Sequence, residues 1–71
     1  MNEYEKTSIK TMEEVLLNQY KAIINEKSVL RQSFLKTEKD AMIATLAIMG
    51  YMVTCDVDMD LKIKDVHVRK I

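Results

Sequence analysis

The sequence predicts an α+β fold in which a long helix and a short, buried second helix precede a C-terminal antiparallel β-hairpin. Apolar residues recur at helical spacing up to Gly50, and strict alternation of apolar and polar residues begins after it. Gly50 is the only glycine, and it lies where a helix would end in a left-handed residue. With 71 residues the chain has room for one domain, which we expect over residues 1–71.

The first helix is expected over residues 7–36. Thr11, followed three residues later by Glu14, forms a capping-box pattern near its start. One helical stripe, with steps of three and four and a gap at Lys27, is formed by Met12, Leu16, Tyr20, Ile23, Leu30 and Phe34. The stripe thins near Ser28, so a break into two helices there is the alternative. Residues 1–6 have no pattern and are a candidate flexible segment.

The second helix is expected over residues 38–49. Thr37 is a suitable N-cap, and Asp40 can reach back to it. Between Ala41 and Met49 apolar residues occupy nearly the whole helical circumference. Such a helix is buried on several sides. Because the first helix can cover only one of them, the others should meet the sheet or another subunit.

The hairpin is expected over residues 51–71. One face is formed by Val53, Cys55, Val57, Met59, Leu61 and Ile63, and the opposite face by Thr54, Asp56, Asp58, Asp60, Lys62 and Lys64. The alternation then changes parity, because the next apolar residues are Val66 and Val68. A turn or a bulge must account for this change.

Two turns remain open for this hairpin. A two-residue turn at Lys64-Asp65 would pair Ile63 with Val66, Leu61 with Val68, Lys62 with His67, and Asp60 with Arg69. A three-residue turn at residues 58–60 would instead pair Val57 with Leu61 and Cys55 with Ile63. Under the second turn, the last six residues need a bulge or a third short strand.

Self-association is expected because so small a chain has few other sources of stability. Cys55 and His67 are the only cysteine and histidine, so one chain can form neither a disulfide nor a four-ligand zinc site. Hydrophobic residues nevertheless make up 48% of the chain. A lone hairpin also leaves strand edges that a partner can cover. We therefore expect a homodimer or higher oligomer with an interface that includes Tyr20, Ile23, Met42, Leu46 and Met49.

Charge and composition restrict the classes of function. The chain has 11 basic and 11 acidic residues, which argues against a general nucleic-acid binder. No basic segment followed by an apolar stretch begins the chain, and the longest apolar run is too short to span a bilayer. A cytoplasmic protein, with no membrane partner, is expected. The richness in Lys, Ile, Asn, Glu and Met is typical of an AT-rich bacterial or phage genome.

Neither a metal site nor a catalytic site is expected. Asp56, Asp58 and Asp60 resemble the start of an EF-hand loop, but Leu61 replaces the required glycine and His67 the required glutamate. The three carboxylates are therefore interpreted as a solvated strand face. Cys55 and His67 should point to opposite faces of the sheet, so they do not form a nucleophile–base pair.

The leading functional prediction is a small non-enzymatic module, an accessory, inhibitor or adaptor protein, that binds a larger protein without a cofactor. Its expected partner-binding surface consists of Asp56, Asp58, Asp60, Lys62, Lys64, His67 and Arg69. An open sheet edge is a second docking mode. The alternative function is a dimeric nucleic-acid-binding regulator that uses the basic end of the hairpin. The neighbouring aspartates and the apolar second helix argue against that alternative.

Overall fold

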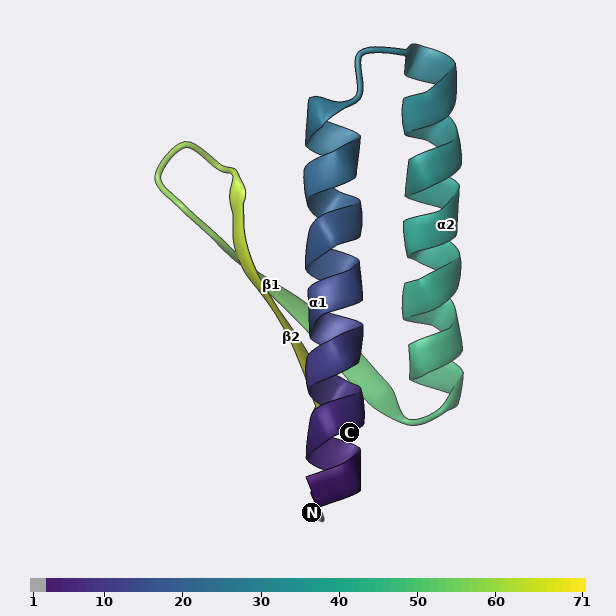
Figure 1. The fold of residues 1–71 in the computed structure, drawn as a ribbon, viewed down its shortest axis with the longest axis vertical. Coiled ribbons are helices and arrows are strands. Elements are labelled where there is room, and N and C mark those ends of the chain that lie inside the picture. Colours follow the sequence, from purple (N-terminus) through teal and green to yellow (C-terminus); the bar gives the residue numbers. More distant parts are fainter. Residues whose placement is uncertain (1–2) are drawn as a thin grey trace.

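The computed structural model describes residues 3–71 as two helices followed by a two-stranded antiparallel sheet. The helices form an antiparallel pair, and the hairpin crosses behind α1 with its tip projecting beyond the helices (Figure 1). The predicted α+β class and the order of elements are confirmed. The elements are α1 (Glu3–Asn25), α2 (Val29–Ile48), β1 (Tyr51–Val57) and β2 (Ile63–Lys70).

The first helix ends eleven residues earlier than predicted, at Asn25 rather than residue 36. Ser28 begins the next helix as its N-cap, with extended backbone and an Oγ atom that accepts a hydrogen bond from the Arg31 amide at 3.4 Å. Glu26 Oε1 accepts the amide hydrogen of Ser28 itself at 3.0 Å. The prediction of one helix over residues 7–36 is therefore wrong, and the alternative break near Ser28 is right.

The helix predicted over residues 38–49 is the C-terminal part of α2. Thr37 lies inside α2, where its hydroxyl donates to the Ser33 carbonyl at 3.0 Å instead of capping a new helix. Threonine can bond the preceding turn in this way, so a cap residue type alone does not establish a helix start. The predicted end is nearly right, because α2 stops at Ile48 and Gly50 has a φ of +92°.

The candidate flexible segment also differs from its prediction. α1 begins at Glu3, so residues 3–6 are helical, whereas Met1 and Asn2 lie outside the described residues. Glu3 and Glu5 occupy the first turn of α1. Negative charge there is favourable beside the unpaired amides and the positive end of the helix dipole.

The hairpin turns through residues 58–62, and neither predicted register is observed. Val53 pairs with Val68 and Cys55 pairs with Val66. The first predicted register paired Leu61 with Val68 and Ile63 with Val66, and the second paired Cys55 with Ile63. The turn is built around Asp58, since its Oδ1 accepts the amide hydrogens of Asp60 at 2.9 Å and Lys62 at 3.0 Å. This local carboxylate–backbone bonding selects the turn, and it is not visible in the apolar pattern.

A bulge explains the change of parity between the two strands. The pairing shifts between Asp56, which lies opposite Asp65, and Val57, which lies opposite Ile63, so that Lys64 is left without a partner. The second predicted turn required a bulge or a third short strand in the last six residues, whereas the observed bulge lies before them, at Lys64. One consequence is that Arg69 lies opposite Met52 and not opposite Asp60.

The core lies between the helix pair and one face of the hairpin. A single buried cluster consists of Ile9, Leu16, Leu46, Val66 and Val68. Leu46 is the only buried residue among those of α2. The second helix is therefore covered on one side within the chain, whereas its apolar circumference predicted burial on several sides.

Candidate functional site

The molecule has more surface than a compact chain of its mass requires. It measures 40 × 26 × 17 Å and exposes 5549 Å². A compact monomer of 8.3 kDa is expected to expose about 4,600 Å². The excess of roughly 900 Å² reflects the elongated arrangement of the helices and the hairpin.

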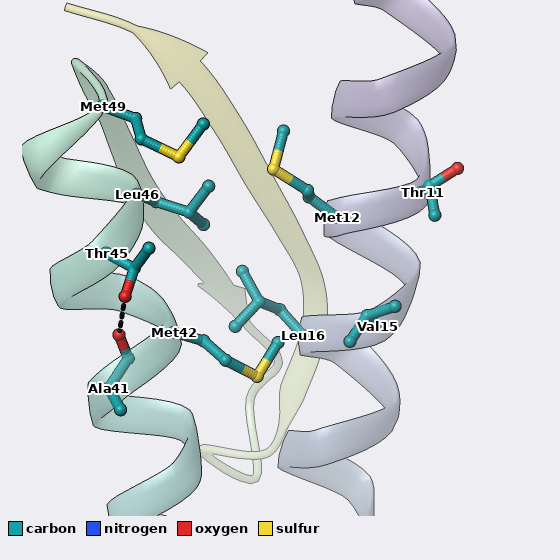
Figure 2. A pocket seen from close by; sticks show the side chains of 9 residues that line it. All are labelled: Thr11, Met12, Val15, Leu16, Ala41, Met42, Thr45, Leu46 and Met49. Atoms are coloured by element: carbon teal, nitrogen blue, oxygen red, sulfur yellow. Dashed lines mark hydrogen bonds between the residues drawn. The ribbon is translucent and has the colours of Figure 1, made fainter.

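An apolar groove runs between α1 and α2, with the strands behind its floor (Figure 2). Its volume is about 420 Å³. None of its lining residues is charged: they are Thr11, Met12, Val15, Leu16, Ala41, Met42, Thr45, Leu46 and Met49. Ligand and partner sites are commonly concave and mostly apolar in this way.

The two threonines do not make this groove polar. The Thr45 hydroxyl donates to the Ala41 carbonyl at 2.8 Å, a bond drawn in Figure 2. The Thr11 hydroxyl donates to the Thr7 carbonyl at 3.0 Å. Each hydroxyl hydrogen is therefore used within its own helix. A partner in this groove would leave neither threonine donor unpaired.

Polar side chains connect the helices beyond the groove, nearer to the turn between them. The Gln19 Nε2 atom donates to the Leu35 carbonyl and to Glu38 Oε2, both at 3.1 Å. Gln32 Nε2 donates to the Ile23 carbonyl at 3.0 Å. These bonds fix the spacing of the two helices, so the walls of the groove are held in place without a ligand.

Further exposed apolar residues lie along α2 beyond the groove. Phe34, Ala41 and Ile48 follow one another at intervals of seven residues, which places them on one side of the helix. Phe34 is 61% exposed and Ile48 is 88% exposed. Leu30 precedes Phe34 by one helical turn and is also exposed. We call the groove residues other than the buried Leu16 and Leu46, together with Leu30, Phe34 and Ile48, the helix face.

The sequence-predicted oligomer interface is divided between this face and the interior. Met42, Leu46 and Met49 line the groove, although Leu46 forms its buried floor. Ile23 is buried inside the chain, and Tyr20 packs against the core cluster. The sequence prediction missed the α1 wall of the groove. Met12 and Leu16 of this wall belong to the predicted stripe and Val15 lies beside it, so the apolar arc of this helix could have indicated them.

Tyr20 connects three elements of the fold. Burial, a hydrogen bond with the Cys55 side chain, and the negative charges of Cys55 and Asp40 raise the pKa of Tyr20 to about 12. The Lys39 ammonium lies 5.4 Å from the centre of its ring. Cys55 is half-buried with a free thiol. Tyr20 is thus a packing residue of the single chain and makes no contribution to the helix face.

His67 is the centre of the polar face of the hairpin. Its Nε2 lies 2.8 Å from Asp56 Oδ2 and 3.9 Å from Asp65 Oδ2. Its Nδ1 lies 4.0 Å from Glu13 Oε2 on α1. The sequence placed His67 beside Lys62 instead. The register does put Cys55 and His67 on opposite faces, as predicted, because Thr54 is the residue opposite His67.

The other predicted partner-binding residues are spread along the hairpin. Asp58 is used in the turn, where Asp60 and Lys62 also lie. Lys64 is at the bulge, and Arg69 is near the opposite end. All of these side chains are exposed, and among the predicted residues only Asp56 and His67 are joined side chain to side chain. The predicted surface is therefore a long polar strip and not a compact cluster.

Known proteins offer no guide to this surface. No protein-family model, no curated protein and no solved structure matches the chain. Within residues 3–71 neither helix has both the length and the apolar character needed to cross a membrane. The same residues contain no group of three or more His, Cys, Asp or Glu side chains arranged to hold a metal ion.

Proposed function

We propose that this chain is a small non-enzymatic protein-interaction module that works as a homodimer, with the helix face as its dimer interface. The uncharged helix face around the groove carries this proposal. Contiguous exposed apolar surface of this kind typically marks an interaction site. Partners in stable complexes each bury about 800 Å². The excess surface of the single chain, roughly 900 Å², is of that size.

A second copy is a suitable occupant because the face is formed by two antiparallel helices. Two such pairs placed face to face around a two-fold axis form a four-helix bundle. Three methionines, Met12, Met42 and Met49, line the groove, and their flexible side chains can adapt to one another across such an axis. The hairpins would then lie on the outer sides of the dimer, where they remain accessible to a larger protein.

The chemistry of the groove supports a binding role over a catalytic one. General acid–base and nucleophilic catalysis need a titratable or activated side chain beside the substrate. No acid, base or thiol lines the groove, and the hydroxyls of Thr11 and Thr45 are bonded within their own helices. We propose that the dimer acts in the cytoplasm as an accessory, inhibitor or adaptor of a larger protein.

Nucleic-acid binding is favoured less by the arrangement of charges. Arg69 and Lys70 lie at the base of the hairpin, whereas Lys62 and Lys64 lie at its tip. Asp65 lies opposite Asp56 between these two groups. A continuous basic strip, which phosphate contacts along a duplex would require, is interrupted by these carboxylates.

Light scattering on a matched pair of variants tests the dimer. Ala41→Glu introduces a charge into the groove, whereas Ala47→Glu makes the same change at an exposed position of α2 outside it. At micromolar concentration we expect a mass of twice 8.3 kDa for the wild type and Ala47→Glu, and the mass of one chain for Ala41→Glu. A monomeric wild type, or a dimeric Ala41→Glu variant, would contradict the proposal.

A further inference from the structure

The two edges of the hairpin differ in how their outward-pointing amides are satisfied. At the β2 edge, the Val68 amide donates to Glu13 Oε2 at 2.8 Å and the Val66 amide donates to Asp65 Oδ1 at 2.9 Å. Carboxylates that occupy an edge in this way prevent another strand from pairing there. The β2 edge is therefore closed.

The β1 edge is open over three alternate residues. Residues directly opposite each other in an antiparallel ladder alternate between bonded and non-bonded pairs. Because the amides of Val66 and Val68 point away from β1, their partners Cys55 and Val53 also point their backbone groups outward, and Tyr51 continues the alternation. Within residues 3–71, no hydrogen bond satisfies the outward amides of these three residues.

The side chains of the same residues are also less completely covered than those of their partners on β2. On the helix-facing side of β2, Val66 is 2% exposed and Val68 is 3% exposed. Their partners on β1, Cys55 and Val53, are only half-buried, although they pack against the same core. A third strand beside β1 would cover these side chains and satisfy the outward amides together.

We propose that the free edge of β1 binds an extended segment of a different protein, which adds to the sheet as an antiparallel third strand. The choice of a different protein rests on the proposed function, because the helix face already serves the second copy. A second symmetric contact between copies along β1 would join dimers into larger assemblies. If each β1 edge instead binds one segment of a different protein, the dimer has two equivalent binding sites and does not assemble further.

The charges along the hairpin specify the polarity of this strand. The half of the hairpin nearer the tip, residues 56–65, carries four aspartates and two lysines, so this half is net negative. Arg69 and Lys70 make the base positive. An antiparallel strand begins beside the tip and ends beside the base, since β1 runs from base to tip. The structure therefore fits a segment with basic residues first, alternating apolar residues next, and an acidic residue last.

The probe for this site is the synthetic peptide Lys-Lys-Val-Thr-Val-Thr-Val-Glu, added to the full chain. Amide hydrogen exchange followed by NMR reports which edge it occupies. We expect exchange at Val53 and Cys55 to slow by about tenfold or more on saturation, because each amide gains a hydrogen bond. Exchange at Val66 and Val68 should stay unchanged. Protection of the β2 amides instead, or of neither edge, would overturn the proposal.

N-methylated peptides separate strand addition from non-specific contact. In the proposed pairing the valines share the helix-facing side with Val53, so their amides point toward β1 and the threonine amides point away. Methylation of the valine amides should weaken binding by roughly tenfold or more, because hydrogen bonds are lost. Methylation of the threonine amides should leave affinity nearly unchanged. Equal effects of the two methylations would overturn the proposal.

Two further controls test polarity and independence from the dimer. The charge-reversed peptide Glu-Glu-Val-Thr-Val-Thr-Val-Lys should bind several-fold more weakly; equal binding would overturn the assigned polarity.

The second control asks whether another copy of the chain occupies the edge. In the free protein, protection of Val53 and Cys55 that increases with concentration would show that it does, which would also overturn the proposal. The Ala41→Glu variant should still bind the first peptide. A monomeric wild type that binds this peptide would contradict the dimer alone, and a dimeric wild type that does not bind it would contradict the strand site alone.

Discussion

The two sides of the helix pair are alike in composition and opposite in environment. On the side that faces the hairpin, Leu16 is 0% exposed and Leu46 is 6% exposed. On the side that faces away, Phe34 and Ile48 remain mostly exposed although they are as apolar. The helical pattern therefore identifies which residues avoid water, but not whether their cover comes from the same chain or from another.

This difference explains why the second helix appeared fully buried in the sequence. Apolar residues around its circumference are covered on one side within the chain, and no part of residues 3–71 covers the other side. If the helix face is a dimer interface, the chain has two apolar cores, one inside the chain and one between chains. The predictions below test this distinction, beginning with the largest expected effect.

The internal core should be the more costly one to disrupt. Leu16→Ala removes a side chain with no exposure, so we expect a loss of about 2–5 kcal/mol in the free energy of unfolding. In a domain this small, such a loss is a large fraction of the total stability. Urea denaturation followed by circular dichroism measures it. A loss below about 1 kcal/mol would contradict the core placement of Leu16.

The adjacent residue provides the control for the other side. Val15 is 46% exposed and lines the groove. In the monomeric Ala41→Glu background, Val15→Ala should cost well under about 1 kcal/mol, since exposed substitutions away from special features have small effects. In the wild-type dimer the same change should cost more. Equal costs in the two backgrounds would show that nothing covers Val15.

The next largest effect on the free energy of unfolding is expected for Glu13, whose carboxylate binds the edge of β2. Glu13→Ala removes the acceptor of the Val68 amide, and a part-buried amide left without a partner costs about 1–3 kcal/mol. Exchange of the Val68 amide should accelerate as well. Glu14→Ala, at the exposed neighbouring position, is the matched control and should change neither quantity. Unchanged exchange in Glu13→Ala would contradict the closed-edge assignment.

These residues also show what the sequence could and could not predict. Helical spacing, alternation and the position of Gly50 predicted the order of elements correctly. The helix boundaries were harder to predict, because Thr37 is as good a cap as Ser28 by residue type. The hydrogen bonds that distinguish the two residues are seen only in the structure. The bulge at Lys64 depends on the geometry of the turn. The hydrogen bond from Val68 to Glu13 joins residues that are far apart in the sequence. Neither has a local pattern.

The candidate surface was predictable to a similar extent. The excess of apolar residues in the second helix led to the prediction of an interface that includes Met42 and Met49, and both residues line the groove. Their role in an interface stays a prediction. The apolar pattern could not distinguish these residues from Ile23, which is also apolar and at helical spacing but is buried within the chain. The charged strip of the hairpin was foreseen as a set of residues. Its arrangement was not, because the register determines which charges meet.

The dimer should make stability depend on concentration. Folding coupled to association is favoured by mass action, so a tenfold higher protein concentration should stabilise the folded dimer by about 1.4 kcal/mol. Thermal unfolding of the wild type over a hundredfold range of concentration should show a rising midpoint. Ala41→Glu should show a constant midpoint. A constant midpoint for the wild type as well would contradict the proposal that an apolar core forms between two chains.

The smallest expected effect concerns Tyr20, which belongs to the internal side of the comparison. Its pKa is raised to about 12 in the folded chain, so folding favours the protonated phenol. The corresponding stabilisation is complete below the unfolded pKa of about 10 and is lost as the pH rises from about 10 to about 12. Denaturation in urea at pH 9 and pH 11 should therefore show a smaller loss of stability in Tyr20→Phe than in the wild type.

Tyr4→Phe is the matched control for this measurement, because Tyr4 is 82% exposed and the structure gives its phenol no buried environment. This variant should lose as much stability as the wild type between the two values of pH. The difference between the two variants therefore reports on the phenol of Tyr20 and its hydrogen bond with Cys55. An identical loss in Tyr20→Phe and Tyr4→Phe would mean that Tyr20 is solvated. The contact between α1 and β1 at Cys55 would then be looser than the structure shows.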